Sequence, residues 1–315
     1  MRKKIVMYFH KRKMEKDPFF TFGAKRSVYH DFFKRGMERG FDMYIASGKD
    51  NYIDPLIFNN AYRYNGAFFE PEPGAIKMDA IFDRSGGMFF PTENISSKVL
   101  NNIYFKRLCN NKNATQELIG DFMPKSARIK NKSELLQNLG SFPPSALAVL
   151  KPANGMCGKG IIIDYPEKLK EEKLEDNREY ILQEFVDTAD GIPGIIDGRH
   201  DLRIVIVNGE IVLSHVRAPK TGSLLANVAQ GGSIDEISLK NIPTFIIDIV
   251  KKIQLRIDKK FEYPIYSIDL GIQNKNELFV FELNDQIGFP SEKMKAHGKF
   301  LDNILDSLEK RFVVD

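Results

Sequence analysis

The stretch 149-VLKPANGMCGKGIII-163 has a lysine after two apolar residues, then three glycines, then a run of isoleucines. Glycine serves any turn that needs a positive φ, so this loop alone does not distinguish a phosphate-binding loop from a hairpin turn. It is not a Walker loop, because Lys159 is followed by Gly160 and not by Ser or Thr. It is not a dinucleotide fingerprint either, because the glycines lead into a strand-like run and not into a helix. Backbone N–H groups and the charge of Lys151 could still bind an anion, so the hairpin and the phosphate site remain equally open.

The composition is that of a globular protein with a sizeable core. Of the 315 residues, 43 % are hydrophobic and 28 % are charged, and the length suits two or three domains. The net charge of +4 is too small to indicate a nucleic-acid-binding protein, and no apolar run approaches the roughly 20 residues of a membrane span. Cys109 and Cys157, the two cysteines, lack the spacing of a metal site or a redox pair. We therefore expect a cytoplasmic protein with no nucleic-acid or membrane partner.

The first 95 residues alternate between strand-like and helix-like segments. The runs 3-KKIVMYF-9 and 41-FDMYIAS-47 predict strands on either side of a helix near residues 24–39. A further buried strand is predicted in 79-DAIFDRSGG-87, and Arg84 lies where this strand ends. Strand ends of this kind host ligands in α/β units, so Arg84 is a candidate substrate-binding residue, although an ordinary surface arginine is an equally good reading.

The middle of the chain predicts helices followed by strands. Residues 96–140 read as helical stretches with Asn-rich breaks, and a Gly- and Asp-rich loop covers 186–200. The strands predicted between these segments are 146-ALAVLKP-152, 160-GIIIDY-165 and 179-EYILQEF-185.

A hairpin follows in 201-DLRIVIVNGEIVLSHVRA-218, with its turn at Asn208-Gly209. In an ideal two-residue hairpin Arg203 and Arg217 face opposite sides, so both could contact one ligand only if a bulge intervenes. His215, on the second strand, is the only histidine expected near a site. Helices are predicted at 241–259 and 297–312, with a second strand pair between them.

This second pair, 264-PIYSIDLGI-272 and 277-ELFVFELN-284, carries three oxygen-bearing side chains. Alternation along a strand places Glu282 and Asn284 on one face, and Asp269 lies on the neighbouring strand. Acids on strands this apolar are costly to bury unless they are paired or bound to a cation, and such hard oxygen ligands suit Mg²⁺. The same alternation predicts that the core contains Phe279, Phe281 and Leu283.

Taken together, these segments resemble the ATP-grasp superfamily, and within it the glutathione synthetase-like carboxylate–amine ligases. The resemblance runs in order from about residue 95 to 290 through "NNK", "LKPANGMCGKGI", "ILQEFV", "DLRIVIVNGEIV", "RAPKTGSLLANVAQGG", "SIDLG" and "FELN". It implies an α/β (α+β) ATP-grasp fold and identifies the glycine loop as a phosphate-binding loop. It also implies an N-terminal pre-ATP-grasp domain (1–95), a central lid subdomain (96–186) and a C-terminal subdomain with the metal site (187–315).

The resemblance assigns ATP and Mg²⁺, with Mn²⁺ as a substitute, to particular residues. Nucleotide binding falls to Lys112, Lys151, Gly155, Gly158, Gly160, Gln183, Glu184, Phe185, Val186 and Asp187, with Asp190 as the alternative to Asp187 at the ribose. The metal ligands are Asp269, Glu282 and Asn284, and the transferred phosphoryl group is held by Arg203, Arg217 and Asn227.

The implied activity is ATP-dependent joining of a carboxylate to an amine through an acyl phosphate, on small-molecule or peptide substrates, with release of ADP and phosphate. A kinase that uses the same ATP site is the alternative, and a non-catalytic nucleotide-binding protein is a third reading. A homo-oligomer is compatible with the sequence. Residues 1–95 match no motif that would name the substrates.

Overall fold

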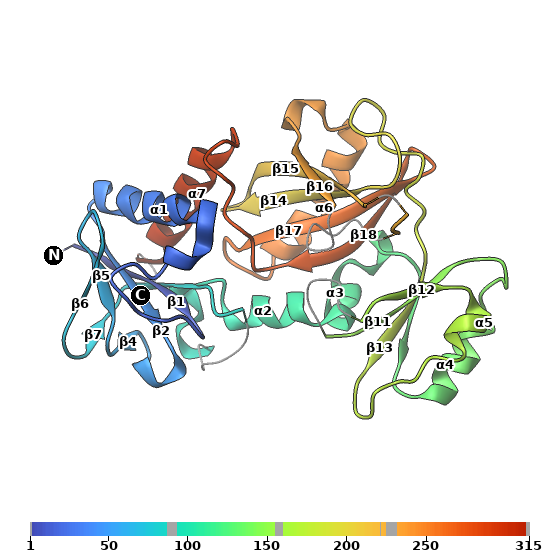
Figure 1. Cartoon of the computed structure of the whole chain (residues 1–315), viewed down its shortest axis with the longest axis horizontal. Coiled ribbons are helices and arrows are strands. Elements are labelled where there is room, and N and C mark those ends of the chain that lie inside the picture. The colour runs from blue at the N-terminus through green and yellow to red at the C-terminus, as the bar shows by residue number, and fades with distance from the viewer. Residues whose placement is uncertain (1, 87–92, 155–159, 221, 225–231, 313–315) are drawn as a thin grey trace.

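Four β-sheets organise the computed structural model of the chain, which describes residues 2–86, 93–154, 160–220, 222–224 and 232–312 (Figure 1). The mixture of sheets and helices agrees with the predicted α/β (α+β) class. In Figure 1 the N-terminal third, in blue, lies to the left, and the two sheets of the remaining chain lie to the right. No helix in the described residues combines the length and the hydropathy that a membrane crossing requires.

The N-terminal residues form the first sheet. Its strands follow the order β6 (Phe69–Pro71), β5 (Tyr62–Tyr64), β2 (Asp42–Ser47), β1 (Lys4–Phe9), β8 (Ala80–Asp83) and β9 (Val99–Leu100), of which the last four are parallel. Helix α1 (Arg26–Glu38) packs its buried Val28, Phe32 and Phe33 against this sheet. A small sheet contains β3 (Tyr52–Asp54), β4 (Ile57–Phe58) and β7 (Ile76–Lys77). The expected α/β unit is present, and its sheet extends to Leu100, past residue 95.

Two short helices, α2 (Ile103–Asn110) and α3 (Lys112–Ile119), connect the first sheet to the next one (Figure 1). The break between them has a local cause. The side chain of Asn111 accepts hydrogen bonds from the backbone N–H groups of Asn113 and Ala114, which caps a new helix one residue after the previous one ends. The cap brings Lys112 to the first position of α3.

The second sheet is antiparallel, in the order β10 (Ser126–Ile129), β13 (Tyr180–Glu184), β11 (Ala148–Pro152) and β12 (Ile162–Asp164). Leu135 and Leu139 of α4 (Lys132–Leu139) and Leu169 of α5 (Pro166–Leu169) complete its small core. The glycine stretch joins β11 to β12, as a strand–loop–strand reading predicts. Strand β10 lies where only helices were expected, because four residues are too few to show a period.

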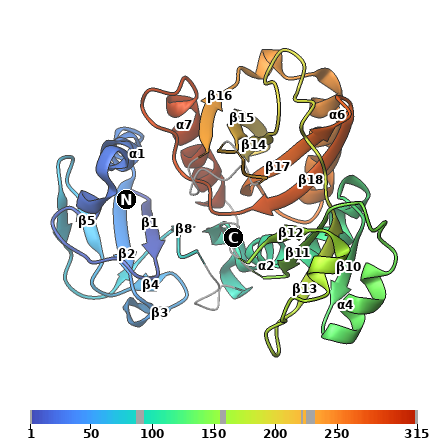
Figure 2. The same ribbon diagram turned by 45° about the vertical axis from the view of Figure 1, so that its right-hand side comes forward.

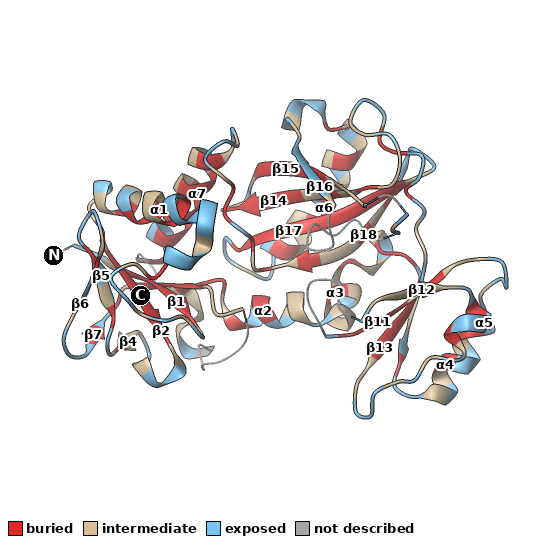
Figure 3. Cartoon of the chain, viewed as in Figure 1, coloured by how far each residue is buried: buried red, intermediate tan, exposed pale blue. Residues whose placement is uncertain are grey.

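The third sheet is also antiparallel, in the order β16 (Ser233–Glu236), β15 (Glu210–Ala218), β14 (Asp201–Val207), β17 (Ile265–Gln273) and β18 (Glu277–Asn284). Helix α6 (Thr244–Asp258) covers one face with Ile246, Val250, Ile253 and Ile257. Helix α7 (His297–Glu309) packs between the end of this sheet and α1, so one core includes parts of both. Figure 3 shows the resulting band of buried strands, with exposed residues concentrated on the outer helices.

The predicted hairpin is confirmed. Asn208 and Gly209 both have a positive φ, 56° and 78°, as a tight turn between right-twisted strands requires. The strand pair shifts register between Val205 and Ile206, and β17 and β18 shift register between Asp269 and Leu270. Each shift is a bulge, and a bulge changes which face the side chains beyond it occupy.

The second bulge corrects one prediction about the core. Because Asp269 pairs with Glu282 while Leu270 pairs with Val280, Phe281 is the extra residue on β18. The buried side chains of β18 are Leu278, Val280 and Leu283, whereas Phe279 and Phe281 lie outside the hydrophobic core. Leu283 was placed correctly, and the strict alternation that assigned both phenylalanines to the core does not hold through the bulge.

Asn101 ties the N-terminal part to the third sheet. Its buried side-chain amide donates to the carbonyl oxygens of Ile265 (2.6 Å) and Asp285 (3.0 Å), and its Oδ1 accepts from the N–H of Ile265 (2.7 Å).

We predict that Asn101→Ala lowers the free energy of unfolding by about 2–4 kcal/mol, because buried backbone groups lose their partners. Chemical denaturation measures this loss. Asn276→Ala, at an exposed turn position, is the control and should change stability by less than about 0.5 kcal/mol; equal effects would contradict the assigned role.

Candidate active site

A cavity of about 440 Å³ lies between the second and third sheets. Figures 1 and 2 show that β11 and β12 of the second sheet lie close to β18 of the third sheet. Eleven of the residues expected at the site line the cavity: Lys112, Lys151, Gln183, Glu184, Phe185, Val186, Arg203, Arg217, Asp269, Glu282 and Asn284. Gly155, Gly158 and Asn227 fall outside the described residues. Gly160 and Asp187 are described but do not line the cavity.

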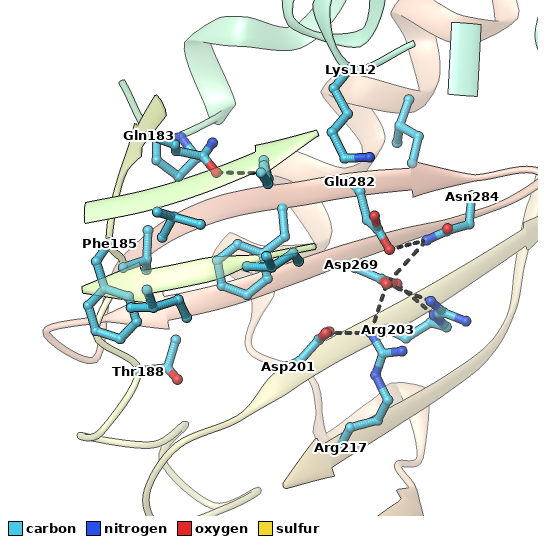
Figure 4. Close-up of a pocket in the computed structure, with 18 of the residues that line it drawn as sticks. Lys112, Gln183, Phe185, Thr188, Asp201, Arg203, Arg217, Asp269, Glu282 and Asn284 are labelled. Carbon is cyan, nitrogen blue, oxygen red and sulfur yellow. Dashed lines mark hydrogen bonds and ion pairs between the residues drawn. The ribbon is translucent and has the colours of Figure 1, made fainter. Parts of the chain in front are cut away.

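The oxygen-bearing side chains of β17 and β18 meet at one end of the cavity (Figure 4). The Asn284 Nδ2 donates to Asp269 Oδ2 and to Glu282 Oε1, at 3.2 Å in both cases. The described residues contain no group of three His, Cys, Asp or Glu side chains suited to a metal, but two carboxylates and an amide oxygen form a hard oxygen set. These donors therefore fit Mg²⁺ or Mn²⁺ better than Zn²⁺.

The two arginines of the hairpin share a face with this oxygen set. The bulge pairs Arg203 with His215 and Asp201 with Arg217, so all four side chains lie on one side of the sheet. Arg203 Nε and NH2 donate to Asp269 Oδ1 and Oδ2, at 2.6 and 2.5 Å, and Arg217 NH2 donates to Asp269 Oδ2 at 2.7 Å. The bulge that the hairpin needed for both arginines to reach one ligand is present.

The charged side chains of the two arginines and of Asp201 and Asp269 on this face are largely buried, and each is paired with a side chain of opposite charge. Burial by itself would raise the pKa of Asp269, but Arg203 and Arg217 outweigh it and hold the pKa well below its usual range. Burial together with the two arginines lowers the pKa of His215 to about 3, so this imidazole is neutral. Asp201, an unexpected member of the group, accepts a hydrogen bond from Arg217 NH2 and has its pKa raised by burial and by Asp269.

On the opposite wall, two lysines face the oxygen set. Burial lowers the pKa of Lys112, and burial together with Lys112 lowers the pKa of Lys151 to about 8. Lys151 Nζ donates to Gln183 Oε1 at 2.7 Å, across the neighbouring strands β11 and β13. The ammonium groups of Lys112 and Lys151 repel each other in this buried pocket. The pocket is therefore attractive to a polyanion.

The other end of the cavity is apolar and was only partly expected. Phe185 and Val186 continue from β13, and Val149, Ile161, Ile163 and Phe281 add walls that the sequence reading did not assign. The Phe281 ring occupies space beside Gly271, where an added Cβ would lie 2.6 Å from Thr188 Cγ2 and would also meet the ring itself. Glycine at 271 therefore lets the bulged phenylalanine lie in the cavity wall. A flat aromatic base fits between such walls.

Other candidates lie at or beyond the margins. The Asp187 carboxylate pairs with Arg199 (3.1 Å) instead of lining the cavity. Cys109 lines the cavity, and burial raises the pKa of its thiol, which disfavours the reactive thiolate. Arg84 lies over the rings of Phe82 and Phe289, at 5.5 and 5.6 Å, where the first sheet meets the loop after β18.

A buried ion network links the oxygen set to the first sheet. Lys106 of α2, which is fully buried, lies 3.0 Å from Asp83 Oδ2 and 3.8 Å from Asp285 Oδ2. Asp285 follows Asn284 directly and lines the cavity. The sequence reading missed this network, because its three members lie far apart along the chain and each resembles a surface charge.

Comparisons with known proteins identify the family and the fold. Residues 116–308 match the RimK-like ATP-grasp domain family. A "Probable alpha-L-glutamate ligase" of Haemophilus influenzae is 25% identical over 169 residues, which is 52% of this chain and 51% of that protein. A protein of the same name from Shewanella halifaxensis is 22% identical over 182 residues, which is 56% of this chain and 35% of that protein. The chain thus spans about half the length of these curated relatives, or less.

Solved structures resemble the whole chain. An ATP-grasp RimK domain protein from Sphaerobacter thermophilus has a TM-score of 0.61 at 12% identity, covering 99% of this chain and 100% of that one. A D-alanyl-alanine synthetase A from Vibrio cholerae has a TM-score of 0.66 at 10% identity, covering 99% of each chain. At these identities the likeness establishes the fold, which is the ATP-grasp fold that the motifs predicted. With the family match over more than half of its length, this chain belongs to the RimK-like ATP-grasp family.

Proposed function

We propose that this protein is an ATP-dependent ligase that activates a carboxylate as an acyl phosphate and joins it to an amine. One observation carries the proposal. A single cavity has two lysines on one wall and, on the facing sheet, the Asp269–Glu282–Asn284 oxygen set in contact with two arginines. Phosphoryl transfer needs this separation of charge, because catalysis consists mainly of positioning and of neutralising the phosphates. Names of relatives, such as alpha-L-glutamate ligase, support the same reaction class.

Residues at different positions in the cavity would bind different parts of the nucleotide and the metal. Lys112 and Lys151 would neutralise the α and β phosphates, while the apolar end formed by Phe185 and Phe281 would hold the base. Asp269, Glu282 and Asn284 would hold Mg²⁺, which would neutralise phosphate charge when it is bound. The assignments of Gly155, Gly158, Gly160 and Asn227 remain part of the proposal.

The proposed reaction has two steps. A carboxylate oxygen of the acid attacks the γ-phosphorus, the bond from this phosphorus to the β–γ bridging oxygen breaks, and ADP leaves with the electron pair. The amine nitrogen then attacks the acyl carbon, the acyl carbon–oxygen bond breaks, phosphate leaves, and the nitrogen gives up its proton to solvent. Arg203 and Arg217 would hold the moving phosphoryl oxygens, where charge shifts in the transition state.

The three parts of the chain would have different roles. The N-terminal domain (1–95) would shape the pocket for the acid and the amine, the lid subdomain (96–186) would close over the nucleotide, and the C-terminal subdomain (187–315) would provide the metal site. The substrates are small-molecule or peptide carboxylates and amines, and the expected location is the cytoplasm, where ATP is available.

Glu282→Gln tests the metal assignment. The substitution keeps the size of the side chain but removes a hard anionic ligand, so ADP release should fall by about 100-fold or more while the melting temperature changes little. Glu277→Gln is the matched control, because Glu277 lies exposed at the start of the same strand. Normal turnover by Glu282→Gln would show that the metal is bound elsewhere.

Lys151→Met tests the phosphate contact. Methionine keeps an unbranched side chain and removes the charge, so the rate should fall by about 10²–10³-fold, the usual loss for one transition-state contact. Circular dichroism checks that the fold survives.

The lowered pKa of Lys151 adds a pH test. Since this pKa is about 8, the ammonium is charged below that pH and loses its proton above it. ADP affinity of the wild type should therefore decrease as the pH rises through about 8, and calorimetry of Lys151→Met should show no such decrease. Identical pH profiles for the two proteins would contradict a charged Lys151–phosphate contact.

Hydroxylamine separates a ligase from a kinase. With ATP, Mg²⁺ and the correct acid but no amine, hydroxylamine should trap an acyl phosphate as a hydroxamate, detected by mass spectrometry. Arg217→Ala should reduce hydroxamate yield more than ATP affinity, because its contact strengthens as charge moves onto the γ-phosphoryl group. A stable phosphorylated hydroxyl product, with no hydroxamate from any acid in the screen, would establish the kinase instead.

A further inference from the structure

The loop between β13 and β14 is closed at its base by buried hydrogen bonds. Thr188 Oγ1 donates to the carbonyl oxygen of His200, and the His200 N–H donates back to Thr188 Oγ1, both at 3.0 Å. The His200 ring then bridges to its surroundings. Its Nδ1 donates to Gly198 O at 3.1 Å, and its Nε2 accepts from the N–H of Ile272 at 3.1 Å. This pattern requires a neutral imidazole, in agreement with the pKa of His200, which burial lowers.

Arg199 directly precedes the fixed His200 in the sequence. Arg199 lines the cavity, whereas Asp187 and Asp190, the acids expected at the ribose, do not. The Arg199 NH2 group lies 3.1 and 3.2 Å from the two carboxylate oxygens of Asp187. Asp187 is itself held in place, since its Oδ1 accepts from the N–H of Ala189 at 3.0 Å and its own N–H donates to Gln273 Oε1 at 3.0 Å. The guanidinium is therefore oriented before any ligand arrives.

The position of Arg199 along the cavity indicates which part of a nucleotide it meets. Figure 4 places Phe185 and Thr188 away from Lys112, Asn284 and Arg203. Arg199 lies toward this Phe185 end, because it pairs with Asp187, the residue before Thr188, and because Thr188 bonds to His200, the residue after Arg199. The base would lie between the apolar walls at the Phe185 end and the phosphates at the Lys112 end. The sugar is the polar part of the nucleotide next to the base, so it is the part that a guanidinium at the Phe185 end would meet. Both contacts with Asp187 use one terminal nitrogen, Nη2, of a guanidinium that carries five N–H donors. The side chain thus retains donor capacity beyond its contact with Asp187.

We propose that Arg199 is the residue that recognises the ribose hydroxyl groups, and that Asp187 is the positioning residue that orients its guanidinium. This inference rests on the proposed function, because it requires a nucleotide in the cavity. A ribose hydroxyl accepts a hydrogen bond from the guanidinium, and the rigid planar fork can serve two neighbouring hydroxyls at once. The ligand class is a ribonucleotide, and the site discriminates against a sugar that lacks one of these hydroxyls.

The test compares ADP with 2′-deoxy-ADP and 3′-deoxy-ADP in calorimetric titrations of the 315-residue chain. The wild type should bind ADP about tenfold more tightly than at least one of the deoxy analogues, the difference expected for one charge-assisted hydrogen bond. Arg199→Gln should weaken ADP binding by about that factor and leave the affected analogue unchanged, so the ratio of the two dissociation constants falls to about one. Asp187→Asn should lower the same ratio by a smaller factor.

Arg178→Gln is the matched control. Arg178 and Arg199 have the same side-chain exposure, 36 %, and each is paired with a carboxylate, but Arg178 does not line the cavity. This variant should keep the wild-type ratio. Arg199→Lys retains a cation and should keep part of the discrimination, which provides a second measurement if Arg199→Gln does not fold.

Two outcomes would overturn the ribose assignment alone: a wild type that binds all three nucleotides equally, or an Arg199→Gln protein that binds all three more weakly by one common factor. The second result would place Arg199 at a phosphate or give it a purely structural role. A wild type that binds none of the three nucleotides would overturn the proposed function as well, so the two failures are distinguishable.

Discussion

The buried carboxylate of Asp269 is the group around which the active face of the third sheet is arranged. A charge this deeply buried is tolerated only when opposite charges and hydrogen-bond donors surround it. Arg203 supplies a bidentate pair and Arg217 a further bond, and these contacts hold the Asp269 pKa low despite burial. The contacts that neutralise the buried Asp269 carboxylate therefore bring the two arginines next to Glu282 and Asn284.

Two bulges make this assembly possible. In a regular hairpin Arg203 and Arg217 would lie on opposite faces, and the extra residue in β15 brings them together. In β18 the extra residue is Phe281, which leaves the core and becomes part of the cavity wall beside Gly271. Bulges thus convert two ordinary antiparallel pairs into a surface with a charged end and an aromatic end. These are the two environments that a nucleotide needs.

Buried polar contacts also connect this face to the N-terminal sheet. Asn101 bonds to backbone groups at the start of β17 and just after β18, and Lys106 lies between Asp83 and Asp285. Such bonds are directional, and each fixes one relative position of the parts that it joins. The end of β8 is therefore held at a defined place relative to Asn284. Arg84 lies at this junction as well, over Phe289.

The linear sequence determined most of the longer strands, the hairpin at Asn208-Gly209, the ATP-grasp fold and eleven of the cavity-lining residues, because turn chemistry, periodicity and motif spacing are local properties. Tertiary structure alone decided which face each strand residue occupies beyond a bulge, and this is why Phe281 was misplaced and Asp201 was missed. It also decided that Arg199, not Asp187, lines the cavity, since that outcome depends on the Thr188–His200 bonds and on the contact of His200 with Ile272. Long-range packing and charge compensation select among conformations that the local sequence permits equally, and they become visible only when the strands are assembled.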